Sequence, residues 1–470
     1  MSRPAVLEGL PELDYTVSSI THKPRLELRG RISRSLVEEL SRSKKEPEWM
    51  LRLRLRSLEL FEKLPMPNWL VGVEELDLEE LAHYVQPDVE RARSWEELPE
   101  EIRRVYERLG LPEIEAKVLS GLAAQFESET VYLAFKKYLE RSGVVLMDMS
   151  EALVKYPDLV KRYFMRVFPP SDHKFAALHG ALWSGGVFLY VPPRVRIEAP
   201  IEAFFFVASE LEGQFEHTLI VADEGSFVHF IEGCAAPLFK KYSFHDGMVE
   251  IYAHRGSHVK FTTVQNWSKN LINFNNKRAI LEENATIEWA EGSLGSKVSY
   301  VYPSAILKGE GARASIANIT LAKGPTWKDS GAKVFHLAPN TSSEVVSKSI
   351  SAQGGVAVYR GLVRVARGAS GSKASVKCDS LILDESSKAY TYPKNEVEEE
   401  SVTVVHEATT GRLSEDALFY AQSRGLSEGE ARRMLVLGYV GDLLGRLPFE
   451  YQVVFRRVLE LEFEELGGYG

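Results

Sequence analysis

The chain has 470 residues, of which 44% are hydrophobic and 26% are charged, values typical of soluble proteins. Its net charge of −9, from 57 basic and 66 acidic residues, argues against a nucleic-acid-binding protein and against a basic membrane-surface protein. No run of eighteen apolar residues occurs and the start Met1-Ser-Arg-Pro lacks a signal-peptide core, so we expect no membrane span and a cytoplasmic location.

The first third of the chain is predicted to be mostly helical, and we assign residues 1–170 to an N-terminal helical domain. A helix is predicted over Ser43–Leu64, with Pro47 near its start and Pro65 just after its end, positions where helices tolerate proline. Residues Leu51–Arg56 alternate like a strand, but the unbroken length of the segment favours the helix. A small sheet is expected at Gly143–Met149. Further helices are expected at Glu96–Leu109, Ile114–Leu122, Thr130–Leu139 and Ser150–Tyr163.

The composition changes at Pro169 to short apolar segments separated by Gly, Pro or Asn, such as Val187–Val191 and Ile201–Val207, which are typical of strands. Within this region a short phrase returns six times, each copy opening with Gly or Asn and then entering strand-like residues. The copies are Gly225–Phe230, Gly256–Phe261, Asn284–Trp289, Gly311–Ile316, Asn340–Val345 and Gly371–Val376.

The starts of these phrases lie 31, 28, 27, 29 and 31 residues apart. Gly and Asn are the residues that best tolerate positive φ at a turn, and a period of this length is typical of a solenoid in which each coil covers the next. We therefore predict a β-helix core domain over residues 171–410. The alternative is an ordinary β-sandwich in which the phrase recurs by chance.

Helical patterns return after the solenoid and predict a C-terminal helical domain over residues 411–470. Ser414 begins one helix, and Ser427-Glu-Gly-Glu430 is a capping box that opens a second. A last amphipathic helix is expected over Phe449–Leu466. This segment is too small to hold a core alone, so it must dock on the solenoid, on a partner, or on both.

Cys234 and Cys378 are the chain's two cysteines, and no C-x-x-C pair occurs. One chain therefore lacks the thiolates for a four-cysteine iron–sulfur site. On an extended strand Cys378 shares a face with Val376 and Ser380, while Lys377 points away. The residues alone leave open whether either cysteine is reactive or a small core residue.

His406 and Glu407 follow the strand-like Ser401–Val405, just before the helical tail. Neighbours on a strand point to opposite faces, a rule that loosens at a strand end, so the two form a weak candidate ligand pair. Stacking of coils could also cluster some of the solenoid histidines His245, His254, His258 and His336. No Walker A, G-x-S-x-G or H-E-x-x-H motif is present, which argues against nucleotide hydrolysis by this chain and against the common hydrolases.

Several short motifs together carry a resemblance to a known family. They are Glu46–Leu51, Phe175–Leu178, Tyr190–Pro192, Gly213–Glu216, Ile231–Pro237, Val264–Trp267, Tyr359–Leu362, Cys378–Ser380, His406–Thr410, Glu415–Tyr420 and Ser423–Gly425. In this order, over roughly residues 45–465, the chain resembles the SufB/SufD family of SUF iron–sulfur cluster assembly proteins. The C-D-S cysteine Cys378 and the H-E-A-T Glu407 favour the B type, because D-type members usually lack both.

The resemblance implies a mainly β fold, with a right-handed parallel β-helix core, an α-rich N-terminal region and a C-terminal helical tail. It implies a scaffold rather than an enzyme. Cys378 would accept sulfur and hold the transient iron–sulfur cluster, His406 and Glu407 would add ligands at a dimer interface, and sulfur would enter at Cys234.

The implied partners are a SufC-type ABC ATPase bound through the C-terminal helices, which would hydrolyse the ATP, and a SufD-type paralogue or a second copy of the chain. A cysteine desulfurase or sulfur carrier and acceptor apoproteins complete the set, and reduced flavin is a further cofactor to consider.

Three departures from the family pattern stand out: no N-terminal C-x-x-C motif, no histidine in Ala389–Pro393, and Ala421 where cysteine is frequent. Two alternative functions are kept. A carbohydrate-active β-helix enzyme would cluster carboxylates on one coil face, whereas acidic residues are scattered here. A structural anchor for an ATPase would need only the tail.

Overall fold

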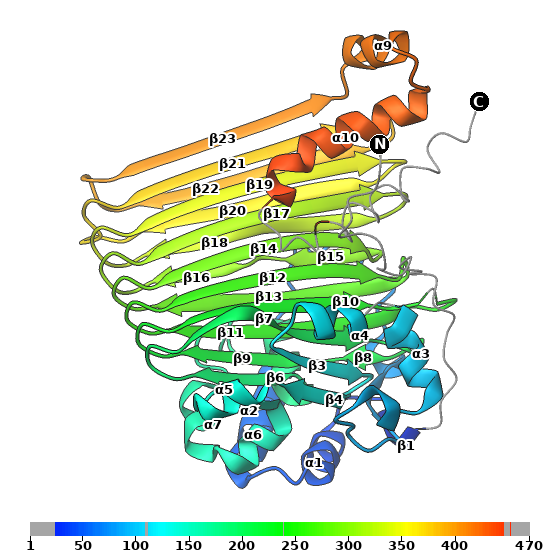
Figure 1. Cartoon of the computed structure of the whole chain (residues 1–470), viewed down its shortest axis with the longest axis vertical. Helices are drawn as coiled ribbons and strands as arrows, with labels where there is room; N and C mark the ends of the chain where they lie inside the picture. Colours follow the sequence, from blue (N-terminus) through cyan, green and yellow to red (C-terminus); the bar gives the residue numbers. More distant parts are fainter. Residues whose placement is uncertain (1–23, 109–110, 238, 446–451, 453–470) are drawn as a thin grey trace.

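The computed structural model describes residues 24–108, 111–237, 239–445 and 452. Two large sheets run the length of the molecule, and their strands stack coil upon coil into a solenoid (Figure 1). One sheet has ten strands in the order β23-β21-β19-β17-β14-β12-β10-β7-β3-β4, and the other has eleven, with β22-β20-β18-β15-β13-β11-β9-β6-β5 as its main path. The predicted mainly β solenoid is confirmed.

The strands of the ten-stranded sheet are β3 (Gly121–Phe126), β4 (Glu129–Phe135), β7 (Arg196–Phe206), β10 (Phe227–Ala235), β12 (His258–Trp267), β14 (Thr286–Gly295), β17 (Arg313–Lys323), β19 (Ser342–Ala352), β21 (Lys373–Ile382) and β23 (Thr403–Arg412). Those of the eleven-stranded sheet are β5 (Val145–Asp148), β6 (Val187–Val191), β8 (Gly213–Gln214), β9 (His217–Ala222), β11 (Ser243–Ala253), β13 (Leu271–Leu281), β15 (Val298–Val301), β16 (Ser304–Leu307), β18 (Trp327–His336), β20 (Val356–Val365) and β22 (Lys388–Val397). β1 (Pro24–Arg29) and β2 (Ala82–Pro87) form a separate antiparallel pair.

Each of the six repeated phrases leads into one strand of the ten-stranded sheet, and the phrase spacing is the strand register. Phe227 pairs with His258, and His258 pairs with Thr286, which are offsets of 31 and 28 residues. The next three pairings repeat the spacings of 27, 29 and 31 residues. The six opening Gly and Asn residues all have φ between 56° and 71°. The turn prediction is therefore confirmed, and the sandwich alternative is wrong.

Because the coils stack in register, apolar side chains form continuous rows inside the solenoid. Phe230 stacks on Phe261 with ring centroids 5.4 Å apart, and Phe261 contacts Trp289 at 5.0 Å. The row continues through Ile316 and Val345 in the same buried cluster. Burial of these side chains is the main term that holds the coils together.

The helices of the N-terminal region cover the first coils of both sheets (Figure 1). They are α1 (Arg34–Ser43), α2 (Glu48–Lys63), α3 (Glu100–Arg108), α4 (Leu111–Lys117), α5 (Lys137–Arg141), α6 (Met149–Lys155), α7 (Pro157–Tyr163) and α8 (Lys174–Leu182), with short 3₁₀ turns at Leu78–Glu80 and Trp95–Glu97. On the eleven-stranded sheet, Phe175 of α8 stacks on Phe274 of β13 at 4.2 Å. The helix predicted over Ser43–Leu64 is confirmed as α2, except that it begins only after Pro47, and the small sheet predicted at Gly143–Met149 is confirmed as β5.

Several predicted helices of this region are corrected. The helix expected over Ile114–Leu122 stops at Lys117, and the residues from Gly121 form β3. The helix expected over Thr130–Leu139 is strand β4 followed by α5. β3 pairs with β7 of the solenoid and with β4, so tertiary pairing outweighs the local helical pattern. The other two predicted helices are shorter than expected: Glu96–Leu109 becomes a 3₁₀ turn and α3, and Ser150–Tyr163 breaks at Pro157.

The C-terminal region holds α9 (Glu415–Ser423) and α10 (Glu428–Leu444). Ser414 caps α9, and both hydrogen bonds of the predicted capping box between Ser427 and Glu430 form at α10. α10 lies against the outer face of the ten-stranded sheet, where its apolar residues join Ile319 and Ile350 in one buried cluster (Figure 1). Docking of the tail on the solenoid is thus confirmed for α10. The helix predicted over Phe449–Leu466 lies outside the described residues, apart from Gln452.

Among the described helices, none combines the length and the apolar character needed to cross a membrane.

Candidate functional site

The structure brings Cys378 and His406 together at the last coil of the solenoid. β21 and β23 pair in register, with Val376 opposite His406 and Cys378 opposite Ala408, so the thiol and the imidazole are diagonal neighbours on the inner face. The Cys378 sulfur lies 3.8 Å from Nε2 of His406, and its S–H donates to the carbonyl oxygen of Glu407 at 3.5 Å. The thiol is almost fully enclosed, with Cys378 3% exposed.

This environment keeps both groups uncharged at neutral pH. Burial, followed by the charge of Asp379, raises the pKa of the Cys378 thiol to about 11. Burial lowers the pKa of His406. The thiolate is the species that attacks a sulfur donor, so the thiol must lose its proton at the moment of reaction. A neutral imidazole next to the sulfur can accept that proton.

Glu407 does not join this pair within one chain. β23 continues to Arg412, so the expectation that the alternation of faces loosens at His406 is wrong. Glu407 pairs with Lys377, both are exposed, and its carboxylate belongs to the outer face of the sheet. Within the described residues, no group of three or more His, Cys, Asp or Glu side chains is arranged to hold a metal ion.

Tyr359 of β20 also borders the pair, from the opposite sheet. Its ring packs edge-to-face on His406, with ring centroids 6.4 Å apart. The tyrosine is 4% exposed and belongs to the same buried cluster as Cys378. The sequence analysis quoted Tyr359 only as part of a motif and gave it no role.

Cys234 lies far from Cys378, near the C-terminal end of β10. It is buried in the solenoid interior, where it pairs with Gln265 on one side and Phe205 on the other. Burial, followed by the nearby Glu232 and Glu216 carboxylates, raises the pKa of its thiol well above the usual value. Five strand steps separate the two cysteines, a distance of about 24 Å at the usual spacing between strands.

Two rows of polar residues connect the cysteines along the inner face of the ten-stranded sheet. The row that ends at Cys378, here called the Cys378 row, consists of Glu232, Thr263, Glu291, Asn318, Ser347 and Cys378. The row that begins at Cys234, here called the Cys234 row, consists of Cys234, Gln265, Ser293, Thr320, Ser349 and Ser380. All of these side chains are buried. No apolar residue interrupts either row.

The sequence analysis missed these rows, although it contained the signal to find them. Counting back from Cys378 by the spacings of the repeated phrases leads in turn to Ser347, Asn318, Glu291, Thr263 and Glu232. The same count from Ser380 ends at Cys234. The register of a solenoid therefore carries functional information that single motifs do not.

Residues of the opposite sheet bond to the rows across the interior. The Lys277 ammonium lies 3.0 Å from Glu232 and 3.0 Å from Glu291, and it also donates to Thr263. Burial lowers the pKa of Lys277, but the two carboxylates outweigh it and the net shift is upward. Further along, Asn318 donates to the Gly331 carbonyl at 2.9 Å.

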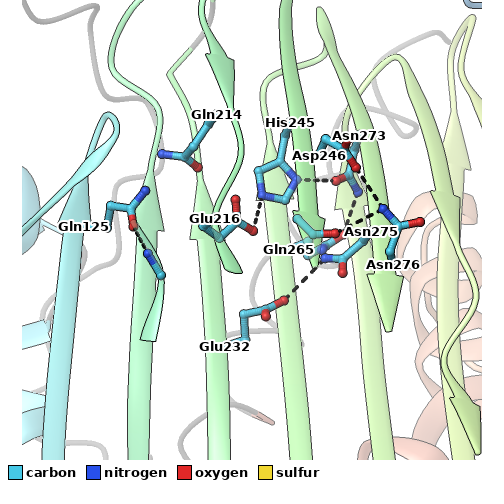
Figure 2. Close-up of polar contacts among 12 residues, drawn as sticks. Gln125, Gln214, Glu216, Glu232, His245, Asp246, Gln265, Asn273, Asn275 and Asn276 are labelled. Atoms are coloured by element: carbon cyan, nitrogen blue, oxygen red, sulfur yellow. Dashed lines mark hydrogen bonds and ion pairs between the residues drawn. The ribbon is translucent and has the colours of Figure 1, made fainter. Parts of the chain in front are cut away.

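Near Cys234 the rows join a wider buried network, drawn in Figure 2. His245 lies between Glu216 and Asn273, at 2.6 Å and 2.8 Å, and Asn273 donates to Gln265 at 2.8 Å (Figure 2). Asn275 reaches Glu232 at 3.4 Å. The beginning of the rows is thus held by hydrogen bonds from both sheets.

The histidines that could have clustered through coil stacking do not meet. His245 is held in the buried network, and His254 lies beside Glu282. The His258 side chain contacts the Glu288 carboxylate, and the His336 ring is hydrogen-bonded to the hydroxyls of Thr341 and Ser343. These contacts are structural, and His406 alone of the predicted candidate histidines lies beside a cysteine sulfur among the described residues.

Comparison with known proteins adds independent information. The family model described as "SUF system FeS cluster assembly, SufBD core domain" matches residues 204–439, and that of the "SufBD protein N-terminal region" matches residues 38–203. The chain is 47% identical to the iron–sulfur cluster assembly protein SufB of Bacillus subtilis (strain 168). It is equally similar to an iron–sulfur cluster assembly SufBD family protein of Staphylococcus aureus (strain MRSA252). Both matches extend over 433 residues, 92% of this chain and 93% of the relative.

Proposed function

Because this chain belongs to the SufBD family of iron–sulfur cluster assembly proteins, we propose that it is a scaffold that receives sulfur and iron, builds a nascent cluster and passes it to acceptor apoproteins. The observation that carries the proposal is the pair of uninterrupted polar rows between Cys234 and Cys378. The iron–sulfur cluster is the cargo of this process.

In this proposal sulfur enters at Cys234, delivered by a cysteine desulfurase or a sulfur carrier, and is collected at Cys378. Thiol–persulfide exchange needs direct contact of sulfur atoms, which a separation of about 24 Å prevents. The two polar rows supply hydrogen-bonding groups over the whole of that distance, beside an interior row from Phe230 to Val376 that is apolar throughout. We infer that sulfur moves along these rows.

The nascent cluster is proposed to form at the open end of the solenoid, on a dimer interface. β22 and β23 each have a hydrogen-bonded strand on one side only among the described residues, and they expose Tyr390, Tyr392, Val397 and Val405. Edge strands that expose large hydrophobic side chains favour pairing with another chain. One chain offers Cys378 and His406 on the inside and Glu407 on the outside, so a SufD-type paralogue or a second copy must complete the ligand set.

A SufC-type ABC ATPase is proposed to dock on the C-terminal helices, where it hydrolyses ATP to drive the scaffold. α10 is anchored to the solenoid, and its neighbour α9 presents Phe419, 73% exposed, and Tyr420, 62% exposed. Large exposed apolar side chains on a helix next to an anchored one are typical of a docking face. The proposed location is the cytoplasm. Reduced flavin remains a prediction to which we assign no residues, and no step depends on it.

The carbohydrate-active alternative finds little support. The interior carboxylates Glu232 and Glu291 are buried and bonded to Lys277, where a polysaccharide does not reach them. The structural-anchor alternative makes no use of the polar rows, and it predicts that loss of Cys378 has no effect on cluster formation.

The test is anaerobic purification of the chain with its co-expressed ATPase, followed by visible absorbance and by iron and sulfide analysis. Cys378→Ser should abolish the chromophore whether the sulfur comes from a desulfurase or from added sulfide. Cys234→Ser is the matched control, because it should lose only the desulfurase-driven chromophore and keep the one obtained with iron and sulfide. A chromophore retained in Cys378→Ser would overturn the proposal.

A further inference from the structure

Two buried polar atoms beside Cys378 lack a hydrogen-bond partner among the described residues: the hydroxyl oxygen of Tyr359 and Nδ1 of His406. Buried polar groups in proteins are nearly always hydrogen-bonded, and an unpaired one costs free energy. Here two such atoms flank the same thiol. These two atoms would gain hydrogen-bond partners if another polar group were bound next to the Cys378 sulfur.

The Tyr359 ring is fixed in this place by its surroundings. It stands on β20 between Ser330 and Thr391 of the neighbouring strands, facing the interior. Two residues further on, the chain has Gly361, where a Cβ atom would lie 2.8 Å from the Tyr359 hydroxyl oxygen. Glycine at position 361 thus leaves the room that the phenol occupies.

The hydroxyl is not engaged by the thiol itself. The S–H of Cys378 is directed at the Glu407 carbonyl oxygen, and the ring of His406 lies against both Cys378 and Tyr359. A tyrosine hydroxyl, with an ordinary pKa of about 10, keeps its proton at neutral pH and can act as a hydrogen-bond donor.

We propose that the Tyr359 hydroxyl donates a hydrogen bond to the outer sulfur atom of a persulfide formed on Cys378, and so holds the first sulfur of the nascent cluster. This inference rests on the proposed function. The Cys378 thiol passes its proton to Nε2 of His406, and the thiolate attacks one sulfur of a small hydrodisulfide (HS–SH), a form in which sulfur at the persulfide oxidation level can arrive along the rows. A new S–S bond forms on Cys378 while the S–S bond of the hydrodisulfide breaks, and hydrosulfide leaves, so no oxidant is required.

The added sulfur lies about 2.05 Å beyond the Cys378 sulfur, the length of one S–S bond. It carries the negative charge of the persulfide in a nearly closed space, where a hydrogen bond to a charged acceptor is stronger than one to a neutral acceptor. The Tyr359 hydroxyl is a buried donor whose bonding capacity is unused, and its ring borders the pair of Cys378 and His406. It thus becomes a residue that contacts the reacting sulfur.

The test uses the full complex loaded anaerobically from a desulfurase and cysteine, and it measures the lifetime of the Cys378 persulfide by cyanolysis. Tyr359→Phe, which removes one oxygen, should shorten this lifetime about tenfold. Tyr138→Phe, at an exposed position of α5 in the N-terminal region, is the matched control and should behave as wild type. The pH profile for alkylation of sulfur-free Cys378 should be unchanged in Tyr359→Phe, because the thiol bonds to the Glu407 carbonyl.

A second variant guards against a simple packing effect. Gly361→Ala should displace the phenol and shorten the lifetime, and it should add little to Tyr359→Phe in the double variant. Two results in Tyr359→Phe would overturn the role of Tyr359 and leave the proposed function standing. One is an unchanged persulfide lifetime, and the other is a pH profile for alkylation of Cys378 that shifts together with the lifetime. Wild-type protein that collects no cyanolysable sulfur on Cys378 would overturn the proposed function as well.

Discussion

The Cys378 sulfur lies 3.8 Å from Nε2 of His406, although the two residues are 28 positions apart in the chain. The contact exists because β21 and β23 are consecutive coils of one sheet and pair in register. It joins a thiol with a raised pKa to an imidazole with a lowered pKa. The pair is thus uncharged at rest and can separate charge when a sulfur donor approaches.

The first prediction concerns the pH dependence of Cys378. In a Cys234→Ser background, the rate of alkylation by iodoacetamide should rise with pH and reach its midpoint near 11, because burial disfavours the thiolate below that pH. His406→Gln should leave this midpoint unchanged. It should slow desulfurase-driven sulfur loading by about 100-fold, the low end of the rate loss that typically follows removal of a general base. A midpoint near the usual thiol value would contradict the enclosed site.

The second prediction tests the polar rows at their middle. Asn318→Leu replaces an amide of the Cys378 row by an apolar side chain of similar size and removes its hydrogen bond to the Gly331 carbonyl. Desulfurase-driven loading of Cys378 should fall at least tenfold, while reconstitution with iron and sulfide should be unaffected. Ile316→Leu, on the same strand in the apolar interior, is the control. Equal loading in both variants would count against sulfur movement along the rows.

The third prediction concerns the buried ion cluster of Lys277. Lys277→Met leaves the Glu232 and Glu291 carboxylates buried without their counter-charge. Removal of one partner from a buried ion pair typically costs about 3–5 kcal/mol, so the urea midpoint of unfolding should fall clearly. The triple variant with Glu232→Gln and Glu291→Gln should recover much of the loss. If the triple variant is no more stable than Lys277→Met, uncompensated charge is not the cause.

The fourth prediction concerns the exposed face of α9. Phe419→Ala combined with Tyr420→Ala should reduce capture of the co-expressed ABC ATPase at least tenfold, since large aromatic residues dominate docking faces. Both side chains are exposed, so thermal unfolding should not change. Gln422→Ala, at an exposed position of the same helix, is the control. Full capture by the aromatic double variant would place the ATPase elsewhere.

Much of the fold was predictable because its determinants are local and repeated. Gly and Asn at the six openings specify left-handed turns, and their spacing is itself the register of the ten-stranded sheet. The capping box at Ser427 and Glu430 is equally local, since it depends on residues three positions apart. Each of these features follows from the chemistry of a few neighbouring residues.

The remaining features depended on contacts between distant parts of the chain. β3 and β4 have a helical pattern in the sequence, and they became strands because an edge of the solenoid was available to pair with them. Likewise, the strand-like pattern in the sequence ends at Val405, but pairing with β21 extends β23 to Arg412. The alternation of faces therefore continues through Glu407, and its side chain faces outward.

The sequence by itself determined the solenoid, its period and the two cysteines. Only the tertiary structure decided that Cys378 meets His406 and that Tyr359 reaches them from the other sheet. The reason is physical: side-chain direction along a strand is a local property, whereas the partner that a side chain meets is set by backbone pairing between coils.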